Sequence, residues 1–391
     1  MHRSDANRSS GLKSILFGAA TLVVIAPVAS PAAAAAQIAG VSIFASGGAV
    51  GGTSPDSITV GNGSVWVEYG NGVDSTGVIP GNSTIVQYGA SGAIKHTYSI
   101  AGEVDGLKVN PTTGMVWALQ NQDANATLSL INPSTGAVTG PLKYAAPPYA
   151  YGPNSGPGAN NGRGYDDVAF LGGQVFLSYT NPSSPTDPVL QLLNQGDNPS
   201  GTLTTTSILT AQQTGIVSPD IDSLKSTPSG QLVLTSEGDG TATTGPAITL
   251  ITNPGAVNQS VANVDVTDGL GNPVQGMDDV LFPTATSGTL YVADSGTNRV
   301  YAIRLRGLDL NTPIVSLGSL DEVGLVNMIT GVATPLLTGA DVPGGALTGP
   351  HGLDFVAGVV PEPGTWAMML VGFGGLGAAM RMRRKSIVAA A

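Results

Sequence analysis

Acidic residues recur at matching points of a repeated pattern in the middle of this 391-residue chain. The recurring positions are Asp105, Asp166, Asp167, Asp222, Asp278, Asp279 and His351. If they open the innermost strands of a radial repeat fold, their side chains converge on one mouth of a central channel. Carboxylate oxygens are the ligands that hard cations such as Ca²⁺ prefer. One hypothesis is therefore a Ca²⁺ site built from Asp105, Asp166, Asp222 and Asp278.

A structural role for the same aspartates is the alternative. An Asp at the start of a strand caps a turn or accepts backbone N–H bonds. In a repeat fold, a repeated residue needs only a repeated structural task. The residues alone favour this second interpretation over the metal site.

Short strands are the elements that would position these side chains. Residues 37–360 contain alternating or wholly apolar runs separated by Gly, Pro, Asn, Asp and Ser, which is typical of strands and turns. Each acidic start is followed by a Gly-x-aliphatic-aromatic-aliphatic strand, with the aromatic position loosely kept, as in Gly63–Val67. We expect Asp278-Asp279-Val280 to pair in the same way with Gly288–Val292. The intervals from Asp56 through the successive starts to His351 are 49, 61, 56, 56 and 73 residues.

Four short strands per unit at this period predict an all-β protein, a β-propeller spanning residues 37–358. Six starts predict six blades, and seven blades are the alternative because the 73-residue interval has room for a further element. The sixth unit lacks a second half, so we expect the strand at Val41–Ala45 to complete it. A β-sandwich pair or a β-helix is the alternative fold.

The composition excludes several classes of function. The chain has no Cys, which removes disulfide scaffolds, thiolate metal sites and cysteine nucleophiles. The net charge of −11 argues against a nucleic-acid partner, which requires a basic surface. Neither Gly-x-Ser-x-Gly, His-Glu-x-x-His nor a Walker-type loop is present. We therefore name no catalytic residue and expect binding rather than catalysis.

The segment from Tyr144 to Tyr165 is rich in Pro, Gly, Asn and Tyr. Tyr rings can stack on sugars while Arg and Asn donate hydrogen bonds to hydroxyls. This favours a ligand loop containing Tyr149, Tyr151 and Arg163. The alternative is a long insertion whose Tyr rings pack back on the blades.

Residues 1–36 have the order of a secretory signal peptide. A basic start precedes an apolar run from Ile15 to Val28, and small residues lead to Ala36. The apolar run is short for a membrane span, which needs about 20 residues. We expect cleavage near Ala36 and export of the remaining chain.

The C-terminal residues 359–386 have the order of a cleavable membrane anchor. A Pro-Glu-Pro motif precedes an apolar segment at 365–380, and a basic stop follows it. The residues of this sorting motif are Pro361, Glu362, Pro363, Trp366, Ala367, Arg381, Arg383 and Arg384.

This tail closely resembles the PEP-CTERM sorting signal of Gram-negative bacteria, in the variant with Trp-Ala after Pro-Glu-Pro. The resemblance implies processing by an exosortase at the inner membrane, followed by release to the cell surface or the extracellular matrix. Carriers of this tail are often associated with exopolysaccharide production, and some are labelled ice-binding. Ice binding would require a flat face of regularly spaced Thr, and the clusters at Thr204–Thr206 and Thr241–Thr244 are too local for that.

Residues Tyr291–Val300 resemble an NHL-type propeller repeat, and gluconolactonase-like propellers share the same strand rhythm. The second resemblance implies a metal-dependent lactonase-type hydrolase, with Glu103 or Glu237 as a further ligand. The main expectation is instead an exported binding or structural propeller. Its partner would be an exopolysaccharide or a surface protein.

Overall fold

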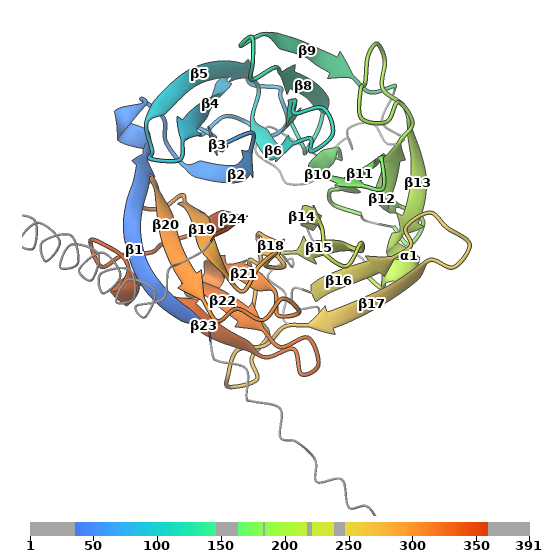
Figure 1. Ribbon diagram of the computed structural model, residues 1–391. Coiled ribbons are helices and arrows are strands. Elements are labelled where there is room, and N and C mark those ends of the chain that lie inside the picture. The colour runs from blue at the N-terminus through green and yellow to red at the C-terminus, as the bar shows by residue number, and fades with distance from the viewer. Residues whose placement is uncertain (1–35, 146–162, 183, 217–220, 238–246, 359–391) are drawn as a thin grey trace, which may run out of the picture. The chain divides into compact units, whose positions relative to one another are not determined.

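The computed structural model describes residues 36–145, 163–182, 184–216, 221–237 and 247–358. These residues form six four-stranded antiparallel sheets, arranged as blades around a common axis (Figure 1). The one α-helix among them, α1 (Ala211–Thr214), is a single turn. The predicted all-β, six-bladed propeller is confirmed.

Each blade has four strands, ordered from the innermost at the axis to the outermost at the rim. Blade one is β2 (Pro55–Gly61), β3 (Ser64–Tyr69), β4 (Asn82–Gly89) and β5 (Ile94–Ala101). Blade two is β6 (Val104–Val109), β7 (Val116–Gln120), β8 (Thr127–Ile131) and β9 (Val138–Lys143). Blade three is β10 (Tyr165–Leu171), β11 (Gln174–Tyr179), β12 (Pro188–Leu193) and β13 (Thr205–Thr210).

Blade four is β14 (Ile221–Ser226), β15 (Leu232–Ser236), β16 (Ala247–Thr252) and β17 (Ser260–Asp265). Blade five is β18 (Val280–Leu281), β21 (Ile314–Leu317), β22 (Glu322–Val326) and β23 (Ala333–Leu337). Blade six is β24 (Pro350–Ala357), β19 (Ser287–Asp294), β20 (Arg299–Arg306) and β1 (Gln37–Ser46).

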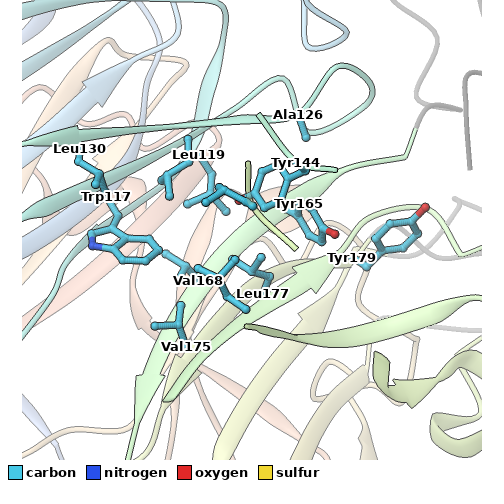
Figure 2. Packing of buried hydrophobic residues seen from close by; sticks show 13 residues of the cluster. Trp117, Leu119, Ala126, Leu130, Tyr144, Tyr165, Val168, Val175, Leu177 and Tyr179 are labelled. Atoms are coloured by element: carbon cyan, nitrogen blue, oxygen red, sulfur yellow. The ribbon is translucent and has the colours of Figure 1, made fainter. Parts of the chain in front are cut away.

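The core lies between neighbouring blades. Successive side chains of a strand point to opposite faces, so each blade packs on both of its neighbours. In β3, Trp66 packs with residues of blade two, while Val67 packs with residues of blade six. Figure 2 shows the interface of blades two and three, where Trp117 lies against Val168 and Val175. Burial on both faces explains why the second strands are apolar almost without interruption.

The expected pairing of the fifth unit is wrong. The segment after Asp279 forms only the two-residue strand β18, which pairs with β21 and not with residues 288–292. Pro283 lies two residues after the end of β18, and proline cannot donate a ladder hydrogen bond. The hairpin of β19 and β20 crosses to blade six, where eight-residue β19 pairs with eight-residue β24. The long interval before His351 therefore holds strands of two blades, and the described residues contain no seventh sheet.

Blade six closes the propeller from three separate stretches of chain. Its innermost strand, β24, is the last of the described strands, and its outermost strand, β1, is the first. The N-terminal strand predicted at Val41–Ala45 is confirmed, because β1 pairs with β20 along its length. Backbone hydrogen bonds, rather than a covalent link, thus join the two ends of the ring of blades.

Candidate functional site

One ionisable side chain from each blade meets at one mouth of the axis. Each comes from the second residue of an innermost strand or, in blade five, from two residues before it. We call these six residues the carboxylate ring: Asp56, Asp105, Asp166, Asp222, Asp278 and His351. Glu103 and Glu237 lie beside them, which brings the number of carboxylates to seven.

The ring and the two neighbouring glutamates form four groups of three residues. Within each group, the ligand atoms all lie within 4.8 Å of one another. The groups are Asp56, Asp278 and His351; Asp56, Glu103 and Asp105; Asp105, Asp166 and Asp222; and Asp222, Glu237 and Asp278. Neighbouring groups share a member, so together they make a continuous circle. The four aspartates that the sequence singled out as metal ligands all belong to it.

Sequence reasoning missed Asp56 as a site residue. Asp56 opens the first repeat in the same pattern as the later starts, so the repeat alignment carried the signal. It lies in β2, and its carboxylate completes the circle between Asp105 and His351.

His351 takes the place that a sixth carboxylate would occupy. Its Nδ1 lies 3.1 Å from Asp278 Oδ1 and 3.2 Å from Asp56 Oδ1. The charge of Asp278, followed by that of Asp56, outweighs burial and raises the pKa of His351 to about 12. Burial raises the pKa of Asp56, but the charge of His351 and the hydrogen bonds with His351 and Asp105 together outweigh burial and leave this pKa lowered. An imidazolium therefore neutralises this side of the ring.

The opposite side of the ring has no such cation among its own members. Burial, followed by repulsion from Asp166, raises the pKa of Asp105 well above its usual range. Burial and then Asp278 raise the pKa of Asp222 in the same way. The pKa of Glu103 rises to about 8, mainly through burial. Crowded carboxylates with raised pKa values bind protons or cations to relieve their repulsion.

The ring forms the floor of a cavity of about 830 Å³. The wall is largely the β3–β4 loop, together with polar residues of blade two. Residues of this wall include Asn71, Asp74, Ser75, Ile79, Asn82, Gln122 and Asp123. No Phe, Tyr or Trp side chain lines the described part of this cavity. Its chemistry is that of amides, hydroxyls and carboxylates.

Asp167 and Asp279 lie beneath the ring and bind their own protein. The Oδ2 atom of Asp167 accepts hydrogen bonds from the Leu224 backbone N–H and the Lys108 Nζ, each at 2.9 Å. The Oδ2 of Asp279 accepts from the Leu353 N–H at 2.6 Å and from Lys225. These aspartates link the innermost strands of adjacent blades. For them the structural interpretation holds.

The two lysines block the axis below the ring. Lys108 pairs with Asp167, and Lys225 pairs with Asp279 and with the Leu353 carbonyl. Between this layer and the ring remains a cavity of only about 20 Å³. That space holds about one water-sized particle. The ring is therefore approached from the large cavity.

The predicted ligand loop lies mostly outside the described residues, and with it Tyr149 and Tyr151. Arg163 is described, and its Nη2 lies 3.2 Å from Oδ2 of the buried Asp187. At the ends of the loop, Tyr144 and Tyr165 are buried between blades two and three.

The segment that resembles an NHL repeat serves the closing blade. Asp294, at the end of β19, accepts a hydrogen bond from the Thr348 N–H at 3.1 Å. Asn298 adopts a left-handed φ of 55°, and its Nδ2 donates to the Gly52 carbonyl at 3.1 Å. These contacts lie at the turn between β19 and β20, where Asp294 pairs with Pro350, the residue before ring member His351.

Comparison with protein families identifies the tail. Residues 359–385 match the model of the PEP-CTERM protein-sorting motif. The chain is an exported protein with an exosortase sorting signal. The match contains every residue of the predicted sorting motif, and these residues lie outside the described structure. Within the described stretches, no helix has the length and apolar composition to cross a bilayer.

Solved structures with similar architecture are distant. They include a protein from Lactobacillus plantarum, with 12% identity, a TM-score of 0.44, and coverage of 78% of this chain and 88% of that one. An α-L-arabinanase from Penicillium chrysogenum has 11% identity, a TM-score of 0.43 and coverage of 72% and 81%. A proposed 6-phosphogluconolactonase from Bacteroides fragilis has 13% identity, a TM-score of 0.37 and coverage of 78% and 74%. No curated protein matches the sequence. None of these likenesses bears on function.

The two classes of aspartate should respond oppositely to neutralisation. Asp279→Asn leaves Lys225 buried without its charge partner, which typically costs about 3–5 kcal/mol of unfolding free energy. Asp222→Asn removes one member of a crowded ring and should raise the melting temperature in the presence of EDTA. Urea and thermal unfolding of both variants measure this contrast. Destabilisation by Asp222→Asn as large as that by Asp279→Asn would contradict the distinction between the ring aspartates and the aspartates that pair with lysines beneath the ring.

Proposed function

We propose that this protein is a cell-surface binding propeller that holds a hard divalent cation, Ca²⁺ in the first instance, at the carboxylate ring. The observation that supports this is the meeting of seven carboxylates with one imidazole at the floor of one open cavity. Oxygen-only ligands match the preference of Ca²⁺, which takes six to eight of them. Burial, followed by repulsion between carboxylates, raises the pKa values of Asp105 and Asp222, and a divalent cation would relieve that repulsion.

The ligand that we propose for the cavity is an exopolysaccharide. The wall offers amides and hydroxyls, such as those of Asn71, Ser75, Asn82 and Gln122, which can hydrogen-bond to sugar hydroxyls. The cavity floor is acidic, so an acidic polysaccharide would bind through the cation. Without Phe, Tyr or Trp rings in the described lining, recognition would depend on hydrogen bonds and cation bridging, not on stacking.

Calcium should stabilise the folded protein. A ligand that binds only the native state adds about 2.7 kcal/mol at one hundred times its dissociation constant. We expect excess Ca²⁺ to raise the melting temperature of the wild type relative to EDTA. Asp105→Asn and Asp222→Asn should abolish the rise, while Asp268→Asn, at an exposed turn, should retain it. Identical melting curves in Ca²⁺ and EDTA would rule out the cation site, and titration with the host's polysaccharide would then test the cavity alone.

Stability without cation should fall as the pH rises. Glu103 has a folded-state pKa of about 8 against an ordinary 4.5, so its contribution is present below pH 4.5 and is lost by about pH 8. His351, raised from 6.5 to about 12, acts in the same direction at higher pH. Melting temperatures in EDTA should therefore decrease from pH 5 to pH 8. Saturating Ca²⁺ competes with protons and should oppose the decrease, so parallel pH profiles with and without Ca²⁺ would contradict the proposal.

A metal-dependent hydrolase of the lactonase type is the second candidate, and Glu103 is the residue that favours it. Its Oε2 is buried without a hydrogen-bond partner, and its pKa of about 8 suits a general acid or base near neutral pH. A panel of lactones and phosphoesters, assayed with Ca²⁺, tests this function. Glu103→Gln should lower turnover at least about 100-fold while Ca²⁺ still stabilises the variant. Absence of turnover in the wild type would exclude the hydrolase and leave the binding function intact.

A further inference from the structure

The sorting tail leaves the propeller at the end opposite to the carboxylate ring. The innermost strand β24 begins at Pro350, next to ring member His351, and ends at Ala357. Seven residues of strand at about 3.3 Å each place roughly 23 Å between His351 and Gly358. Gly358 is fixed there, because its N–H donates to the Ser287 carbonyl at 3.1 Å and its carbonyl accepts from Ser287 Oγ at 2.8 Å.

The strand register places the start of the propeller at the same end of blade six. Gln37, the first residue of β1, pairs with Arg306, and Arg306 pairs with Ser287. The next residue, Gly288, pairs with Ala357. Three strand spacings of about 4.8 Å therefore separate the two points at which the chain enters and leaves the propeller.

The surface around this exit, which we call the underside, includes the turns that follow the innermost strands of blades one to five. The exit of the tail takes the corresponding place in blade six. The five turns are residues 62–63, 110–115, 172–173, 227–231 and 282–286, and none contains a charged residue. Charged residues beside them are Asp309, in the loop that leads into β21, Asp197, whose carbonyl accepts from Asn110, and Lys95, whose Nζ donates to the Gly63 carbonyl. The opposite end carries the seven carboxylates of the ring and cavity.

We propose that the underside faces the membrane and that the cavity opens away from it while the tail is in the bilayer. Seven residues lie between Gly358 and Trp366, and the eight steps from one to the other reach at most about 28 Å. That length is close to the depth of the blade itself. To turn the cavity toward the bilayer, the tail would have to run back along the whole blade.

Electrostatics favours the same orientation. Anionic headgroups repel a surface that carries clustered carboxylates when the two are within a Debye length, about 8 Å at physiological salt. The underside carries charges of both signs, with Lys95 and Arg306 beside Asp197 and Asp309, and the clusters of three carboxylates found among the described residues lie at the ring instead. The proposal rests on the sorting tail and the strand register, so it stands or fails independently of the cation site.

The absence of cysteine allows the orientation to be measured with single labels. Thr113 is exposed in an underside turn, and Val78 is 48% exposed in the loop beside the cavity. Thr113→Cys and Val78→Cys, each in the full chain with its tail intact, carry the same fluorophore. The two proteins are reconstituted into vesicles of phosphatidylethanolamine and phosphatidylglycerol that contain a headgroup-level lipid quencher. We expect severalfold stronger quenching at residue 113 than at residue 78.

Equal quenching at the two positions, or stronger quenching at residue 78, would overturn the proposal. A second variant tests the tether as the cause. Insertion of about twenty Gly and Ser residues between Gly358 and Val359 adds a flexible span of about 25 Å and should reduce the difference between the labels. An unchanged difference would show that the short tether does not set the orientation. Melting curves of all variants, matched to wild type, verify that the labels report on folded protein.

Discussion

Convergence of six innermost strands on one axis is the constraint from which the site follows. Any residue that the repeat places near the start of these strands must meet its five counterparts within a few ångströms. When that residue is Asp, a crowded circle of like charges results. The fold meets this cost in two ways: His351 supplies a positive charge within the circle, and Lys108 and Lys225 supply two more beneath it. The remaining excess of negative charge is what the proposed cation would balance.

Adjacent aspartates that look identical in the sequence have different surroundings. In Asp166-Asp167 and Asp278-Asp279, the first residue lines the cavity, and the second accepts hydrogen bonds from the next blade. The backbone is irregular at both doublets: the first lies at a register shift of β10, and the second lies just before β18. The structural interpretation holds for Asp167 and Asp279, and the cation site at Asp166 and Asp278 is a proposal.

The sequence was sufficient for the features that depend on local pattern. Strand rhythm predicted the propeller, and the repeat predicted both six blades and the ring aspartates of blades two to five. The pairing of strands in blades five and six could not be predicted from the sequence, because it depends on competition between distant strands. Both the β19–β20 hairpin and β21 are apolar enough to pair with β18, and only the lengths of the strands decide that the hairpin goes to β24. The roles of Lys108 and Lys225 were also hidden, because nothing local distinguishes a lysine on the axis from one in solvent.

The threefold origin of blade six governs when the protein can become complete during export. In chain order β1 comes first, its partner β20 follows only after four whole blades, and β24 is the last of the described strands. Contacts this distant in sequence form slowly and late. Until β24 has been delivered, β1 has an unpaired edge, the ring lacks His351, and the cavity has no closed floor. Completion of the fold thus coincides with arrival of the sorting signal, which begins directly after β24. The exosortase consequently meets the tail only when all six blades of the propeller can first be complete.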